Sequence, residues 1–193
     1  RVADHRLLVF ADKKLMKGKY IYGRMRRNVI TGDNPGHTMP FSNASRFNIL
    51  AAVTVKDDCV KPFEYIILVK VRTYAPIFLQ LVKRLIIVGT LERGGIFVVN
   101  NCHVHIQGDN SGLQESLKTD FGILMSPLSP YHPEFNPTEL VFNTLLMRLR
   151  SARARYKAVN SMNFGELIKM VLDNITMRDV SAFYNFCGYY INN

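Results

Sequence analysis

Two polar side chains follow apolar runs of strand length and are placed where a chain can do chemistry. Asn100 follows the apolar residues 96–99, three of which are β-branched, and Asp12 follows the apolar residues 7–11. Runs of this length and composition are typical of buried strands. In an α/β sheet, a polar side chain at the end of such a strand faces the crevice in which these sheets bind ligands. We therefore expect Asp12 and Asn100 to line a binding crevice.

A third candidate, Glu139, lies at a predicted helix start. The segment Asn136-Pro137-Thr138-Glu139 has Asn as N-cap, Pro at the first helical position and Glu at the third, which is a strong helix-start pattern. Two interpretations stay open from this motif alone. Glu139 either closes a capping interaction only, or it approaches Asp12 and Asn100 from its helix.

The stretch 95–150 resembles the second half of the catalytic domain of DDE transposases of the Tc/mariner superfamily. In that family an apolar strand ends in Asp-Asn with a His shortly after, and a Pro-Tyr-Ser-Pro-x-x-Asn-Pro-x-Glu/Asp segment opens a helix. Here residues 100–105 are Asn-Asn-Cys-His-Val-His, and residues 130–139 are Pro-Tyr-His-Pro-Glu-Phe-Asn-Pro-Thr-Glu. The family's second catalytic Asp is replaced by Asn100, and its Ser by His132.

The resemblance extends over residues 7–150, because Asp12 takes the place of the family's first Asp, with Lys13 in place of the following Glu. It implies that Asp12, Asn100 and Glu139 are the catalytic and metal-binding positions of a centre that cuts and joins DNA with two Mg²⁺ or Mn²⁺ ions. Mg²⁺ is a hard ion that takes carboxylate oxygens. Two such ions stabilise the attacking and leaving oxygens of an in-line displacement.

Asn100 departs from this pattern in charge, because its amide keeps an oxygen but lacks the negative charge of a carboxylate. We expect weak metal binding in the chain as written, and two bound ions only if Asn100 is restored to aspartate. Two functions follow: a transposase catalytic domain with an impaired centre, or a domesticated transposase-derived module that binds DNA without nuclease activity. The Asn-Pro-x-Glu segment disfavours a third, a ribonuclease H-like nuclease outside transposition.

The charge of the chain favours a polyanionic partner. The net charge is +10 over 193 residues, and 12 of the 25 basic residues fall in two segments without acids, 13–27 and 148–157. A solvated surface usually mixes the two signs, so DNA is favoured over a bland basic face. From these segments we expect DNA contacts by Lys13, Lys14, Arg26, Arg27, Arg148, Arg150 and Arg153. His105 lies at the family's His position and is a further candidate for a DNA contact, with a structural hydrogen bond as the alternative.

The remaining composition excludes some classes of protein. The three Cys are scattered, which fits a reducing compartment rather than a disulfide framework or a zinc site. No apolar run reaches transmembrane length, and no long amphipathic helix flanks the basic segments, so we expect no membrane partner. The resemblance implies a possible homodimer, and a nuclear location in a eukaryote or a nucleoid location otherwise.

The elements that would position the site follow from apolar periodicity. We expect a single α/β domain over 1–193: a ribonuclease H-like, mixed five-stranded sheet flanked by helices, the fold that the DDE family shares. Its first and fourth core strands would lie side by side. Strands are expected near 7–12, 47–55, 65–71, 96–99 and 122–125, and residues 19–23 can return as an antiparallel partner of the first strand. Helices are expected at 74–88, 111–119, from 137, and at 164–175 and 178–190. The long link 24–45 is either a partner- or DNA-contacting arm or a surface loop.

Overall fold

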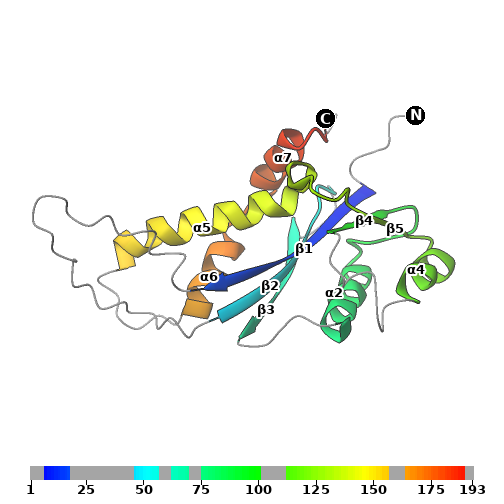
Figure 1. The fold of residues 1–193 in the computed structure, drawn as a ribbon, viewed down its shortest axis with the longest axis horizontal. Coiled ribbons are helices and arrows are strands. Elements are labelled where there is room, and N and C mark those ends of the chain that lie inside the picture. The colour runs from blue at the N-terminus through cyan, green and yellow to red at the C-terminus, as the bar shows by residue number, and fades with distance from the viewer. Residues whose placement is uncertain are drawn as a thin grey trace, which may run out of the picture.

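The computed structural model describes residues 7–17, 46–56, 62–69, 75–100, 112–156 and 164–189, of which 17, 69 and 152–156 are described for the backbone only. These residues form one mixed sheet with helices on both faces (Figure 1). The helices and strands that were expected between 75 and 186 are present with small shifts of their ends. No helix of the described part of the chain is both long enough and apolar enough to span a bilayer.

The sheet has five strands in the order β3-β2-β1-β4-β5. β2 pairs antiparallel with β3 on one side and with β1 on the other, whereas β4 pairs parallel with β1 and β5 pairs parallel with β4. The strands are β1 (Leu8–Lys17), β2 (Arg46–Val53), β3 (Phe63–Val69), β4 (Ile96–Val99) and β5 (Leu124–Pro127). The predicted neighbourhood of the first and fourth core strands is thus confirmed by the β1–β4 pair.

Helices cover the two faces of the sheet unequally. Figure 1 shows α5 lying across one face with α6 and α7 beside it, and α2 and α4 on the other face. The helices are α2 (Ala75–Ile87), α4 (Leu113–Phe121), the 3₁₀ turn η2 (Pro133–Phe135), α5 (Pro137–Tyr156), α6 (Phe164–Asp173) and α7 (Met177–Phe186).

Two apolar cores separate these helices from the sheet. Alternate residues of β1 enter different cores, as the pleat of a strand requires. Phe10 and Met16 join the core under α5, α6 and α7, here called the α5 core. Val9 and Ala11 join the core over α2 and α4, here called the α2 core. A buried Tyr184 fastens α7 to the sheet, because its hydroxyl lies 2.9 Å from the carbonyl oxygens of both Leu8 and Val53.

The first strand differs from the expected one. It was expected to end at Asp12, but β1 continues to Lys17, and its antiparallel partner is β2, from Phe10↔Val53 to Lys17↔Arg46. Residues 13–17, Lys-Lys-Leu-Met-Lys, lack the alternation of apolar and polar residues that indicates a strand, so this part of β1 was not predicted. In the structure Met16 is buried in the α5 core, whereas Leu15 is exposed. The expected return strand 19–23 and the link 24–45, with its possible arm, lie outside the described residues.

Candidate active site

The site begins where the parallel ladder of β1 and β4 ends. The two strands pair from Leu8↔Ile96 to Ala11↔Val99, and the backbone N–H of Asn100 donates to the carbonyl of Ala11 at 3.2 Å. Asp12 is the next residue of β1, which continues alone beside β2. Asp12 and Asn100 therefore lie together at the point where strand connectivity changes direction, the usual position of ligand sites in open α/β sheets.

The carboxylate of Asp12 is buried, with 2% of its surface exposed, and both its oxygens accept hydrogen bonds. Oδ1 accepts from the backbone N–H of Lys13 at 2.6 Å and from Nδ2 of Asn100 at 3.0 Å. Oδ2 accepts from Nδ2 of Asn136 at 2.9 Å. These three donors satisfy a buried carboxylate that would otherwise be costly to desolvate.

The Asn-Pro-Thr-Glu segment positions the start of α5 over this carboxylate. Oδ1 of Asn136 accepts the backbone N–H of Thr138 at 3.1 Å, which is the predicted N-cap. The hydroxyl of Thr138 donates to the carbonyl of Phe10 at 3.3 Å and fixes the helix end on β1. One amide side chain thus caps α5 with its oxygen and holds Asp12 with its nitrogen.

Glu139 faces β1, so its role is not limited to a capping interaction at the start of α5. Its Oε2 lies 2.7 Å from Nζ of Lys14, and both side chains are partly exposed, at 25% for Glu139 and 33% for Lys14. The ammonium also lies 5.9 Å from the ring centroid of Phe142, one turn further along α5. Because Lys14 is two residues after Asp12, the two side chains emerge on the same face of β1.

The pKa of Asp12 depends on its burial, its hydrogen bonds and the charges of Glu139 and Lys14. Burial, the largest influence, raises the pKa of Asp12 above its usual range, and the hydrogen bonds from Asn100 and Lys13 only partly offset that rise. The negative charge of Glu139 raises the pKa of Asp12 further, whereas the ammonium of Lys14 lowers it. The centre therefore favours positive charge and N–H donors.

The residues present do not fit a divalent cation. Mg²⁺ needs oxygen lone pairs directed at one point, but both oxygens of Asp12 accept amide N–H groups, and Glu139 is paired with an ammonium. Among the described residues no three His, Cys, Asp or Glu side chains come close enough to hold a metal ion. The carboxylates of Asp12 and Glu139 thus face nitrogen donors from the chain, which is the reason why they do not fit a divalent cation.

Two of these partners were not predicted as parts of the centre. Asn136 was assigned only to the helix cap, and Lys14 only to DNA. The signal for Lys14 was its spacing of two from Asp12, which places both on one strand face once the strand is known to continue. The signal for Asn136 was its position next to a helix start that had to approach Asp12.

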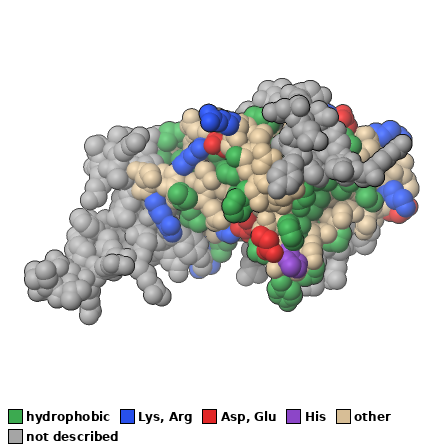
Figure 2. Space-filling view, turned by 90° about the horizontal axis from the view of Figure 1, so that it is seen from above, with side chains coloured by type: hydrophobic (Ala, Val, Ile, Leu, Met, Phe, Trp, Pro, Cys, Tyr) green, Lys and Arg blue, Asp and Glu red, His purple; other side chains and the backbone are tan. Residues whose placement is uncertain are grey.

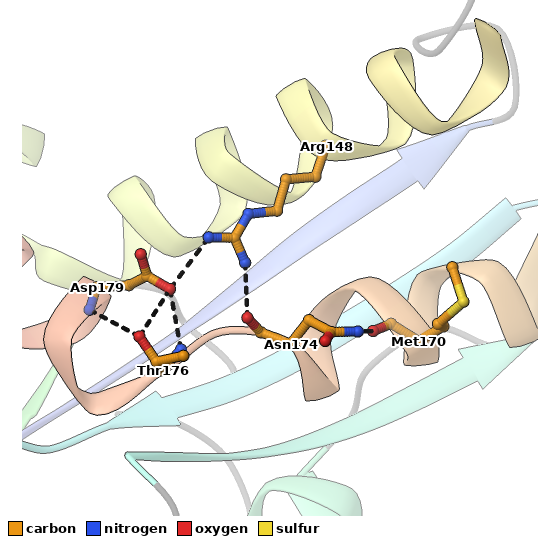
Figure 3. A network of polar contacts seen from close by, with 5 residues as sticks. All are labelled: Arg148, Met170, Asn174, Thr176 and Asp179. Carbon is orange, nitrogen blue, oxygen red and sulfur yellow. Dashed lines mark hydrogen bonds and ion pairs between the residues drawn. The ribbon is translucent and has the colours of Figure 1, made fainter. Parts of the chain in front are cut away.

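The predicted DNA contacts have different surroundings. Lys13 contributes its backbone N–H to Asp12, and Arg150 is exposed on α5. Arg148 has intramolecular partners: it donates to the carbonyl of Asn174 at 2.8 Å and to Oδ2 of Asp179 at 3.0 Å (Figure 3). Arg26, Arg27, His105 and the side chain of Arg153 lie outside the described residues.

Basic side chains are scattered over the described surface. Figure 2 shows Lys and Arg side chains on the face seen from above Figure 1, separated by apolar and uncharged groups, with acidic side chains near the centre of the view and beside some of the basic ones. The face drawn there includes large parts outside the described residues. A basic DNA path along α5 therefore stays a prediction.

Comparison with known proteins points to one fold. No protein-family model matches the chain, and no curated protein matches it in sequence. Solved structures do match. The Mos1 mariner paired-end complex with Mn superposes with a TM-score of 0.53 at 14% identity, covering 97% of this chain and 57% of the matched chain. The pre-cleavage Mos1 transpososome matches with a TM-score of 0.51 at 14% identity, with the same coverage.

A retroviral assembly gives a similar result. The simian T-cell lymphotropic virus intasome, in complex with the PP2A regulatory subunit B56 gamma, matches with a TM-score of 0.53 at 11% identity, covering 88% of this chain and 47% of the matched chain. The chain thus spans about half the length of these proteins. At such identities the likeness shows the fold. The chain has the ribonuclease H-like fold of DDE transposases and retroviral integrases, as the sequence resemblance implied.

Proposed function

We propose that this chain is the catalytic domain of a DDE transposase of the Tc/mariner type, that it acts on DNA, and that Asn100 impairs its centre. The main support is one contact: Asp12 and Asn100, 88 residues apart in sequence, meet where the ladder of β1 and β4 ends, with 3.0 Å between Oδ1 of Asp12 and Nδ2 of Asn100. The helix that bears Glu139 is docked over them through Asn136 and Thr138. The matching motifs and the shared fold support the same conclusion.

The charge of residue 100 decides whether the centre can work. A carboxylate there would add a full negative charge, and a unit-charge pair at 4 Å is worth about 4 kcal/mol at an effective dielectric of 20. The amide offers instead a hydrogen bond, whose net contribution is about 1 kcal/mol. Because the amide nitrogen of Asn100 points at Asp12, it satisfies that carboxylate rather than adding to its charge.

The test is the reversion Asn100→Asp, assayed as nicking of supercoiled plasmid DNA with Mn²⁺ or Mg²⁺. We expect the chain as written to leave the plasmid intact and the revertant to nick it in a metal-dependent manner. Adding Glu139→Gln to the revertant is expected to abolish the nicking, because a second charge is removed from the same centre. Nicking that survives this second change would place the active centre elsewhere.

A second candidate function is a DNA-binding module without nuclease activity. The observation that favours it is the pairing of both Asp12 oxygens, and of Oε2 of Glu139, with donors from the chain itself. A revertant that binds both Mn²⁺ and duplex DNA but never nicks the DNA would select this function. Self-association into a homodimer and a nuclear or nucleoid location are parts of the proposal that rest on the resemblance alone.

A further inference from the structure

Lys14 brings an ammonium group into the centre from the same strand that carries Asp12. Its β2 partner in the ladder is Ile49, a residue of the α5 core, so its side chain emerges towards α5. There it forms a contact of 2.7 Å with Glu139, a residue 125 positions away in sequence. Because this contact requires both the sheet register and the docked helix, it belongs to the folded centre and not to a mobile surface chain.

We propose that the Lys14 ammonium is a built-in counter-ion of this centre, which stands in for a divalent cation and opposes its binding. The inference rests on the proposed function, since it concerns the same carboxylates. With both acids ionised, the centre as written holds two carboxylates and one ammonium. A full set of three carboxylates without a lysine would be two charge units more negative, and Asn100 accounts for only one of them.

This arrangement gives the chain two separate barriers to a divalent cation. Asn100 removes a negative charge, and Lys14 adds a positive one at Glu139. A divalent cation that binds Glu139 must displace the ammonium or remain close to it. The Asn100→Asp revertant therefore binds metal less tightly than its carboxylates alone would allow, and removal of Lys14 should raise the affinity further.

The experiment measures Mn²⁺ affinity by titration of the free-ion EPR signal, together with the rise in melting temperature that Mn²⁺ produces. Four full-length proteins are compared: the chain as written, Asn100→Asp, Lys14→Gln and the double variant. Because removing a nearby unit charge changes an ionic interaction by more than one tenfold step, the double variant should bind Mn²⁺ at least about tenfold more tightly than Asn100→Asp alone. It should also gain the largest increase in melting temperature, since binding to the native state alone raises stability.

Lys13→Gln in the Asn100→Asp background is the matched control. Lys13 is on the same strand and loses the same charge, but its β2 partner Leu50 belongs to the α2 core, so its side chain emerges from the opposite face. We expect little change in Mn²⁺ affinity from this variant. Lys14→Arg in the same background keeps the charge, and it should not raise the affinity either.

The outcomes separate the inference from the proposed function. Equal Mn²⁺ affinity of Asn100→Asp with and without Lys14→Gln would overturn the counter-ion role while leaving the proposed function intact. An equal gain from Lys13→Gln would overturn it too, because the effect would then be one of general charge. If even the double variant, still folded by circular dichroism, binds no Mn²⁺, the centre is not a metal site and both proposals fail.

Discussion

At the scale of single residues, Asn136 is the side chain on which most of the site depends. It lies buried between the helix start and Asp12, and its two amide atoms have different tasks. The oxygen caps α5 at Thr138, while the nitrogen donates to Asp12. A carboxylate could perform only the first task, and an aliphatic side chain neither. The chemistry of an amide is therefore what this position requires.

We predict that Asn136→Ala and Asn136→Asp separate the two tasks. The alanine variant loses the cap and leaves the buried Asp12 with one donor fewer, which should cost roughly 1–3 kcal/mol of unfolding free energy in urea titrations. The aspartate variant keeps a capping oxygen but places a carboxylate against Asp12. Its cost should be large at pH 7 and shrink as the pH is lowered to 4, because protonation removes the repulsion. A pH-independent cost of Asn136→Asp would show that this side chain does not face Asp12.

At the scale of elements, hydrogen bonds hold α5 in position both at its N-terminus and near Arg148. Its N-terminus is held on β1 by Thr138, and further along Arg148 reaches the connection between α6 and α7 (Figure 3). Oδ2 of Asp179 accepts from Arg148, and Asp179 forms a reciprocal capping box with Thr176 at the start of α7. The network thus joins three helices on one face of the sheet.

We predict a pH-dependent contribution from Asp179. Partial burial raises its pKa, but the hydrogen bonds from the Thr176 backbone and from Arg148 outweigh that effect and hold the pKa below its usual range. The stabilisation is therefore complete above the unfolded-state pKa, about 3.9, and is lost as the pH falls through the lower folded-state pKa. Asp179→Asn should cost about 1 kcal/mol at pH 7. The stability difference from the unchanged chain should narrow between pH 5 and pH 3 in urea titrations. A constant difference would mean that the charge of Asp179 has no part in the network.

At the scale of the whole molecule, the excess of basic residues is the feature that DNA would meet first. The net charge is +10, from 25 basic and 15 acidic residues. Part of this charge is engaged within the fold, since Lys14 pairs with Glu139 and Arg148 with Asp179. Of the three predicted arginine contacts of α5, Arg148 is thus a helix-packing residue as well. Replacing Arg148 would also change the packing of α7, so a resulting loss of DNA affinity could not be assigned to a lost DNA contact.

We predict that duplex DNA binding depends strongly on salt and that Arg150→Ala with Arg153→Ala lowers this dependence. Each lost phosphate contact should reduce the slope of log affinity against log salt by about 0.9, so the pair should reduce it by almost two. Arg148→Ala serves as the contrast, because it should lower the melting temperature. An unchanged salt slope in the double variant would place the DNA path away from α5.

The sequence alone determined the local parts of this protein. Apolar runs marked the strands that end next to Asp12 and Asn100, and Asn136-Pro137 marked the start of α5, because these patterns reflect short-range backbone preferences. The limits of β1 were wrong, since lysines within a strand are tolerated only where its pairing with β2 and the α5 core stabilises it. Tertiary structure alone decided the partners in the centre. Asn136 meets Asp12 across 124 residues, and Lys14 meets Glu139 across 125. These contacts depend on sheet register and on helix docking, which periodicity along the chain does not encode.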